Sequence, residues 1–307
     1  VLHTTIDIEL QRIALRELRT QAEAGDPKQQ PLWGALVLVD LANGDLLAAA
    51  SWKRGVEHAG TAPFAPYQSL FEPGSIVKPL VLAYAHEVGV LDWTQSFDCR
   101  PGSREYRERI AALGRRRPVR DDHDCTDLDS HGILVNSSNI GAAYVGLLLE
   151  REQWRDYMSC YGFGESLDLR IPHEAVGGPH RRSFADDIPL RSFRANSAIS
   201  FSFGYELQAN ALQIARAYLR LFTGAHAELR LCRGVELDGS FHPVPLPHDR
   251  GPRFRPEVVE AVRAALVDVV SADPHATGHH LHRRMLADSG IDLHGLIGGK
   301  TGTAATR

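Results

Sequence analysis

Segments with strand-like composition lie near both ends of this chain, and helical patterns fill the region between them. Residues 33–39 form a short apolar run, Asn43-Gly44 is a turn signal, and residues 46–50 are again apolar, which predicts a β-hairpin. The segment 296–304 predicts another strand, whose three glycines indicate the close approach of a backbone or ligand. This order predicts an α+β fold, with an antiparallel sheet flanked by helices and an inserted all-helical lobe.

Helix signals are clear at several places between these strands. Asp7 is a plausible N-cap for a helix through Gln21. A second helix should begin at Ser75, where Pro79 is so close to the N-terminus that it forfeits about one intrahelical bond. We expect one domain over residues 1–307, with an α/β part at 1–80 and 256–307 and a helical lobe with loops at 81–255. Further helices are predicted at 140–149, 212–222 and 256–270, and loops or a weak hairpin at 223–255.

Size and charge exclude some classes of function. A chain of 307 residues buries about three quarters of its unfolded surface, so it needs no crosslinks to hold a core. A net charge of −4 gives no electrostatic case for nucleic acid or an anionic membrane. The arginines at 115–117 are offset by Asp121, Asp122 and Asp124, and we interpret this stretch as a solvated loop. No apolar run approaches the ~20 residues of a membrane span, and we expect the chain to be a piece of a longer protein.

Two cysteines could form a disulfide, and a group of histidines raises the question of a metal site. Cys99 and Cys125 bracket the charged loop, and a disulfide there would add roughly 3–4 kcal/mol, although two free thiols fit equally well. No cysteine spacing resembles a zinc ribbon. The histidines at 275, 279, 280 and 282 are dense, but no carboxylate or cysteine stands close by at ligand spacing. We therefore expect no metal and no cofactor.

Ser75 and Lys78 form the first motif that carries chemistry. At positions i and i+3 of a helix they share one face, so the amine can reach the hydroxyl. A desolvated lysine can give up its proton whereas arginine cannot, and lowering a lysine pKa from about 10.4 to about 7 takes roughly 4–5 kcal/mol. Burial and a second cation such as Lys300 would supply that shift. Alone the motif is weak, because many helices contain Ser-x-x-Lys by chance.

Two more motifs follow in order along the chain, Ser-Ser-Asn at 137–139 and Lys-Thr-Gly at 300–302. The set Ser-x-x-Lys, Ser-x-Asn and Lys-Thr-Gly is typical of penicillin-recognising serine acyltransferases. The chain thus resembles the transpeptidase domain of penicillin-binding proteins, of the monofunctional class B type. The resemblance covers nearly the whole chain and includes residues 4–11, 34–48, 71–79, 137–142, 203–218 and 299–304.

The resemblance implies a catalytic role for five residues. Ser75 would attack the carbonyl of a D-Ala-D-Ala stem peptide and form an acyl-enzyme, with Lys78 as the base. Ser137 would pass a proton toward the leaving amine, assisted by Lys300. Asn139 would hydrogen-bond the substrate amide. β-Lactams would acylate the same serine.

The resemblance also implies a substrate-binding edge beyond the third lysine. Thr301 and Thr303, on either side of Gly302, would hold the terminal carboxylate of the substrate. The backbone N–H groups of Ser75 and Thr303 would form the oxyanion hole. Two departures from the family weaken the match: Ala209-Asn210-Ala211 replaces a common Thr-Pro pair, and the strands and helix that normally follow the third motif are absent.

The leading hypothesis is a D,D-transpeptidase that cross-links peptidoglycan at the periplasmic or extracytoplasmic face of the membrane. Its partners would be stem peptides, β-lactams and other cell-wall synthesis proteins, and its parent protein would be membrane-anchored. A hydrolytic relative is the first alternative: a D,D-carboxypeptidase, a β-lactamase or a β-lactam sensor. Class D β-lactamases and related sensors carry Val where this chain has Asn139, so those fit poorly. The second alternative is an inactive scaffold, which would have no need for two desolvated amines.

Overall fold

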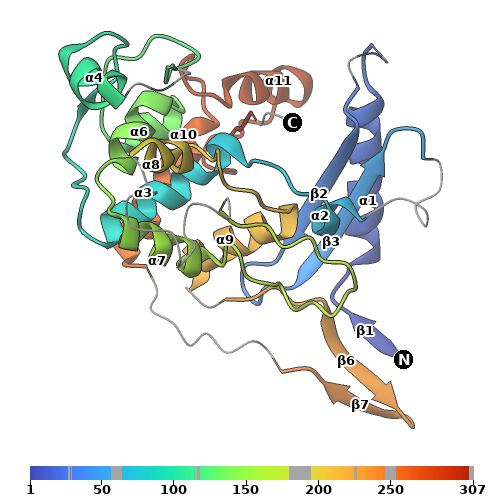
Figure 1. Cartoon of the computed structure of the whole chain (residues 1–307). Coiled ribbons are helices and arrows are strands. Elements are labelled where there is room, and N and C mark those ends of the chain that lie inside the picture. Colours follow the sequence, from blue (N-terminus) through green and yellow to red (C-terminus); the bar gives the residue numbers. More distant parts are fainter. Residues whose placement is uncertain are drawn as a thin grey trace. The chain divides into compact units, whose positions relative to one another are not determined.

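The chain divides into two compact units, each assembled from separate parts of the sequence (Figure 1). The computed structural model describes residues 1–26, 28, 30–56, 64–113, 115, 118–179, 195–224, 227–245 and 254–303. The first unit comprises Val1–Phe71, Ser159–Gly178 and Ala209–Arg253, and the second comprises Glu72–Met158, Pro179–Gln208 and Phe254–Arg307. In the described residues no helix is both long and apolar enough to cross a membrane.

The predicted hairpin is confirmed in the first unit. Strands β2 (Trp33–Val39) and β3 (Leu46–Lys53) pair in antiparallel register, with Leu36 opposite Ala50. The connecting turn is closed by the Asn43 side chain, whose Oδ1 accepts from the N–H of Asp45 at 2.8 Å. The two-residue period of the strands sends alternate side chains to opposite faces of the hairpin.

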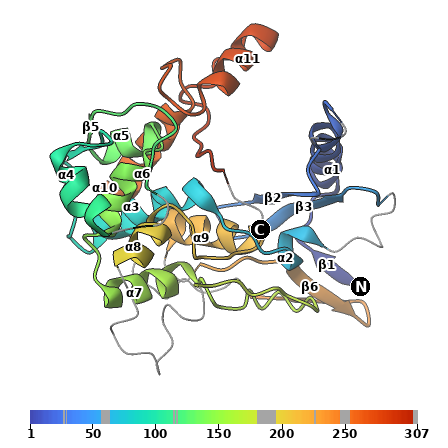
Figure 2. The ribbon, with the colours of Figure 1, turned by 45° about the horizontal axis from the view of Figure 1, so that its top comes forward.

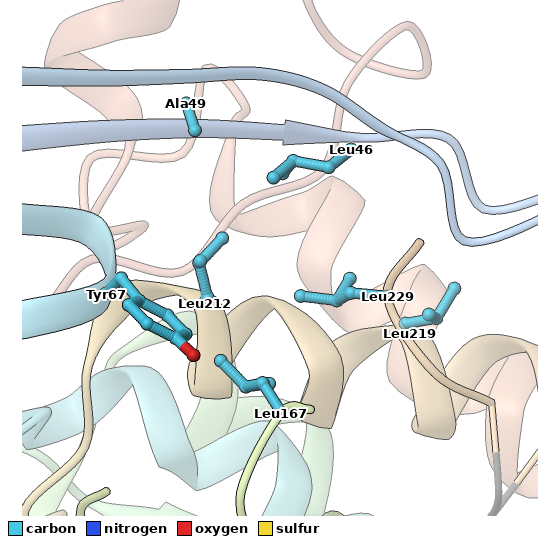
Figure 3. Packing of buried hydrophobic residues seen from close by; sticks show 7 residues of the cluster. All are labelled: Leu46, Ala49, Tyr67, Leu167, Leu212, Leu219 and Leu229. Atoms are coloured by element: carbon cyan, nitrogen blue, oxygen red, sulfur yellow. The ribbon is translucent and has the colours of Figure 1, made fainter. Parts of the chain in front are cut away.

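One face of the hairpin packs on helix α1 (Ile8–Glu23), and Asp7 caps this helix as predicted, at 2.9 and 3.0 Å from two N–H groups. Ala14 of the helix packs there against Ala48 and Ala50. The other face packs on helix α9 (Ala211–Thr223). Figure 3 shows this second core, formed by Leu46, Ala49, Tyr67, Leu167, Leu212, Leu219 and Leu229.

A second small sheet lies in the first unit. Strand β6 (Cys232–Leu237) pairs antiparallel with both β1 (Leu2–Thr4) and β7 (Ser240–Pro243). The β6–β7 pair confirms the weak hairpin predicted within 223–255. Small antiparallel sheets with many helices make the fold α+β, as the sequence predicts.

Helix α3 (Lys78–Glu87) is the buried centre of the second unit. Residues 78–86 of this helix are all buried, and it contacts α6 (Asn139–Gly146), α5 (Ser130–Val135) and α10 (Pro256–Val269) (Figure 2). Pro79 lies in its first turn, where the missing N–H would have no intrahelical partner. The remaining elements are α2 (Ala65–Gln68), the 3-10 turns η1 (Gly74–Val77) and η2 (Ala111–Leu113), β4 (Phe97–Asp98), α4 (Arg104–Arg109), β5 (Asp127–Leu128), α7 (Arg151–Tyr161), α8 (Ala195–Ser202) and α11 (His279–Ser289).

The predicted strand at 296–304 is wrong for its described residues, 296–303, which form a turn and an extended loop. A strand exists only where a neighbouring backbone completes its ladder. Here the backbone bonds to helices and turns instead, as where the N–H of Gly299 donates to Leu266 O at 2.8 Å. The close backbone approach inferred from the glycines is confirmed, since a Cβ on Gly298 would lie 3.1 Å from the Leu266 backbone.

The structure also tests the expected disulfide and the solvated-loop interpretation of the charged loop. Cys99 and Cys125 are free thiols. The solvated-loop interpretation is wrong for Arg115, whose guanidinium donates to Asn196 O at 2.6 Å and Ser200 Oγ at 3.1 Å. Arg116 and Arg117 lie outside the described residues. The predicted division into an α/β part and a helical lobe stays a prediction, and the compact units have other boundaries because α9 packs on β2 while α10 packs on α3.

Leu212 offers a direct test of the hairpin core. Its side chain is fully buried, so Leu212→Ala should lower the free energy of unfolding by about 2–5 kcal/mol through lost contacts and a residual cavity. Leu41→Ala is the matched control, because Leu41 is 46% exposed. Urea unfolding followed by circular dichroism measures both variants. Equal losses of stability would contradict the packing described.

Candidate functional site

Ser75 lies in a turn that only glycine neighbours allow. It belongs to η1, which runs directly into α3, and the N–H of Lys78 donates to Ser75 O. Gly74 has φ +61°, and a Cβ at this position would overlap the backbone of Thr303. The N–H of Gly74 donates to Gly204 O at 3.2 Å. The turn therefore brings the backbones around 204 and 303 against the serine.

The amine of Lys78 is fully buried and hydrogen-bonded to the second motif. Its Nζ donates to the carbonyl oxygen of Ser137, to Ser137 Oγ at 3.3 Å and to Asn139 Oδ1 at 2.8 Å. Ser75 lies in the 3-10 turn η1 and Lys78 is the first residue of α3, so the α-helix begins three residues later than predicted. Among the described residues, however, the amine bonds to Ser137 and Asn139 rather than to the Ser75 hydroxyl.

Ser137 accepts hydrogen bonds from both lysines at its hydroxyl oxygen. Its φ of +55° lies in the left-handed region, which few residues other than glycine adopt and which is common at functional sites. Lys300 Nζ donates to Ser137 Oγ at 2.7 Å and to Thr301 O at 2.9 Å. A hydroxyl oxygen has two lone pairs, and the two amines can occupy both. The proton of Ser137 is then free to point elsewhere.

Both amines are shifted toward neutrality. Burial and, after it, the charge of Lys300 together lower the pKa of Lys78 to about 7, against the opposing charges of Asp121 and Asp122. Burial lowers the pKa of Lys300 to about 8. A pKa near 7 makes the neutral form of Lys78, which can accept a proton, accessible at neutral pH.

The motifs meet at one pocket of about 200 Å³. Most of the predicted site residues line this pocket. Lys78 does not line it but bonds to Ser137 and Asn139, which do. Phe203 and Tyr205 also line the pocket, whereas Phe201 of α8 is buried against Trp154. The lining residues are Ser75, Asp122, His123, Asn136, Ser137, Asn139, Phe203, Tyr205, Thr277, Thr301, Gly302 and Thr303.

Helix α10 positions the loop that carries Lys300. Asp268 of this helix bonds through its two carboxylate oxygens to His294 Nε2 and His131 Nε2, both at 2.9 Å. Together with the bond from Gly299 to Leu266, this attaches residues 294–299 to α10 at two points. The third motif therefore needs no strand ladder to reach Ser137.

Sequence reasoning missed a carboxylate that bonds to the second motif. Asp121 was included in the solvated loop, but its carboxylate accepts the hydroxyl of Ser138 at 2.7 Å and the N–H of Ile140 at 3.0 Å. An acidic residue 17 positions before its partner leaves no local pattern, so no sequence signal pointed to it.

The histidines set aside earlier lie near α11. His282 is buried, and its Nδ1 has no hydrogen-bond partner in the described structure. Within the described residues no group of three His, Cys, Asp or Glu side chains is arranged to hold a metal ion.

Comparison with known proteins gives one family over most of the chain. The sequence profile of the "Penicillin binding protein transpeptidase domain" matches residues 34–307. A probable peptidoglycan D,D-transpeptidase PenA of Neisseria meningitidis is 29% identical over 98% of this chain and 45% of its own length. A probable peptidoglycan D,D-transpeptidase PbpC of Pseudomonas aeruginosa is 31% identical over 70% of this chain and 35% of its own length. The chain thus spans less than half the length of these relatives.

Solved structures share the fold. The apo transpeptidase domain of Burkholderia pseudomallei penicillin-binding protein 3 matches with a TM-score of 0.70 at 24% identity, over 99% of this chain and 78% of that one. A second structure, described as a peptidoglycan glycosyltransferase from Burkholderia ambifaria, matches with a TM-score of 0.68 at 23% identity, over 99% and 82%. At these identities the likeness concerns the fold.

The coupling of the two lysines can be measured directly. Lys300→Met removes the charge but keeps most of the apolar stem, so the pKa of Lys78 should rise, by roughly one pH unit. The chain has only four lysines, so NMR with ¹³Cε-labelled lysine can follow each titration separately. Lys28→Met, which removes an exposed lysine of the other unit, is the control. A Lys78 pKa that stays constant or falls in Lys300→Met would contradict the coupling.

Proposed function

This chain belongs to the penicillin-binding protein transpeptidase family, and we propose that it catalyses D,D-transpeptidation of peptidoglycan stem peptides through an acyl-enzyme on Ser75. The observation that carries the proposal is the convergence of Lys78 and Lys300 on the hydroxyl of Ser137, in the pocket that Ser75 lines. Two partly neutral amines around one serine are costly to bury and serve proton transfer.

In the first half of the reaction, Ser75 Oγ attacks the carbonyl carbon of the penultimate D-Ala, and its proton passes to neutral Lys78. Since the amine bonds to Ser137 and Asn139 in the free protein, we infer that it turns toward Ser75 when the substrate is bound, or that the proton travels through Ser137. The developing oxyanion would accept hydrogen bonds from the backbone N–H groups of Ser75 and Thr303. The two segments are in close contact, since Gly74 packs against the backbone of Thr303.

The tetrahedral intermediate then collapses and the bond to the terminal D-Ala breaks. Its nitrogen needs a proton, and Ser137 is placed to give it, because the lysines donate to its oxygen and leave its proton free. That proton is replaced from Lys78, which took it from Ser75. An acceptor amine finally attacks the ester carbonyl, loses its proton along the same path and releases the Ser75 hydroxyl.

Substrate binding would use the wall of the same pocket. Asn139, whose Oδ1 is held by Lys78 and whose Nδ2 donates to Arg120 O at 2.8 Å, would face the substrate amide. Thr301 and Thr303, with Gly302 between them, would hold the terminal carboxylate near the Lys300 charge. Phe203 and Tyr205, whose ring centroids lie 5.6 Å apart in an edge-to-face arrangement, would cover the apolar part of the ligand.

The setting of the reaction is part of the proposal. Peptidoglycan lies outside the cytoplasmic membrane, so we place the domain at the periplasmic or extracytoplasmic face, in a longer membrane-anchored protein that works with other cell-wall synthesis proteins. The substrate class is supported by the two relatives, which are described as probable peptidoglycan D,D-transpeptidases. β-Lactams, which mimic the stem peptide, would acylate the same serine.

Labelling with a fluorescent penicillin tests the proposal. The full-length natural protein should carry one covalent label, and Ser75→Ala should carry none, because the nucleophile is missing. Ser289→Ala is the control, since its exposed hydroxyl lies on α11. A wild-type protein that remains unlabelled would overturn the assignment.

The lifetime of the label separates the proposed function from a hydrolytic one. No glutamate is found among the described residues that line the pocket, so we expect the acyl-enzyme to persist for many minutes. Release within seconds, followed in the same labelled sample, would favour a β-lactamase.

A further inference from the structure

The carboxylate of Asp121 lies at the N-terminus of α6, directly behind the second motif. It accepts the hydroxyl of Ser138 at 2.7 Å, the N–H of Asn139, and the N–H of Ile140 at 3.0 Å. The first N–H groups of a helix have no intrahelical acceptor, and the helix dipole favours a negative charge at this end. Asp121 satisfies both demands from a distant part of the chain.

A second link connects the carboxylate to the helix itself. Ser138 Oγ donates to Asp121 and accepts from the N–H of Gly141 at 2.9 Å, so it is both bound by the carboxylate and the N-cap of α6. Ser138 is fully buried, and an unpaired hydroxyl would be costly there. The Asp121–Ser138 pair therefore fixes where α6 begins.

The preceding segment holds the neighbouring amide from the other side. Asn139 Nδ2 donates to Arg120 O at 2.8 Å, while its Oδ1 accepts from Lys78. Residues 120 and 121 thus bind the side chain and the backbone of Asn139 at once. Ser137, one residue before the cap, owes the direction of its carbonyl and hydroxyl to this anchored turn.

Asp121 also places a negative charge beside the buried amine. Its charge raises the pKa of Lys78, against burial and Lys300, and the charge of the exposed Asp122 acts in the same direction. The Cys125 thiol is itself neutral, because burial, the charge of Asp121 and a hydrogen bond to that carboxylate raise its pKa to about 12. The charge of Asp121 therefore opposes the loss of the Lys78 proton more strongly than that of Asp122.

We propose that Asp121 is a positioning residue of the acyl transfer: it anchors the Ser137–Asn139 turn at the start of α6 and holds a negative charge toward Lys78. The inference rests on the proposed function for its kinetic part alone. Its geometric and electrostatic parts concern the free protein.

Asp121→Asn removes the charge and keeps two of the three bonds, since only the bond from the Ser138 hydroxyl is lost. The amide oxygen can still accept from the N–H groups of Asn139 and Ile140, but the charge is gone, so the pKa of Lys78 should fall by several tenths of a pH unit to about one. The rising limb of the penicillin acylation rate against pH should move to lower pH by the same amount. Asp122→Asn is the matched control, since it removes a neighbouring exposed charge and none of the three bonds, and it should shift the limb less.

Asp121→Ala removes the bonds as well, and the acylation rate on the plateau above the limb should fall by about 10- to 100-fold because the turn loses its anchor. A Lys78 pKa in Asp121→Asn equal to that of the wild type, measured by NMR with labelled lysine, would overturn the electrostatic part. Wild-type rates in Asp121→Ala would overturn the anchoring part. If Asp121→Ala does not fold, the pH dependence of acylation and the pKa of Lys78 in Asp121→Asn still test the proposal.

The two proposals fail separately. A wild-type protein that penicillin never acylates would defeat the proposed function, yet the NMR titration of Lys78 in Asp121→Asn would still test the charge. Normal acylation with an unmoved limb and an unmoved Lys78 pKa would defeat the inference and leave the proposed function standing.

Discussion

The buried ammonium of Lys78 is the interaction on which the rest of the site depends. Removing such a group from water costs several kcal/mol unless it is hydrogen-bonded and balanced by charge. Three acceptors from Ser137 and Asn139 meet it, and Asp121 supplies a nearby negative charge. Burial, with the charge of Lys300, outweighs that charge and lowers the pKa of Lys78 to about 7. At this pKa the amine can both accept and donate a proton near neutral pH.

The fold of the second unit buries this amine. Helix α3 is buried along residues 78–86, so the lysine at its first position enters the core beside the start of α6. Gly74 lets the backbone of Thr303 approach the serine turn, and α10 holds the loop before Lys300. Three segments far apart in sequence thus converge on Ser137, and its left-handed backbone turns both of its oxygens to the amines.

The sequence predicts the parts of this structure that rest on local rules. Asp7 as a cap, the hairpin at Asn43-Gly44 and the tolerated Pro79 each follow from the chemistry of a few neighbouring residues. Order and identity of three motifs predict which side chains gather. Tertiary partners decide the rest: residues 296–303 form no strand because no ladder completes them there, and Asp121 looks like one more solvated acid until α6 is placed beside it.

The central claim is that neutral Lys78 serves Ser75, and the acylation rate of the wild-type protein measured across pH 5–9 tests it most directly. If the claim holds, the rate rises with pH along a limb centred near 7, and the NMR titration of Lys78 has the same midpoint. A rate that does not change with pH, or a Lys78 that titrates near its ordinary value of 10.5, would contradict the account.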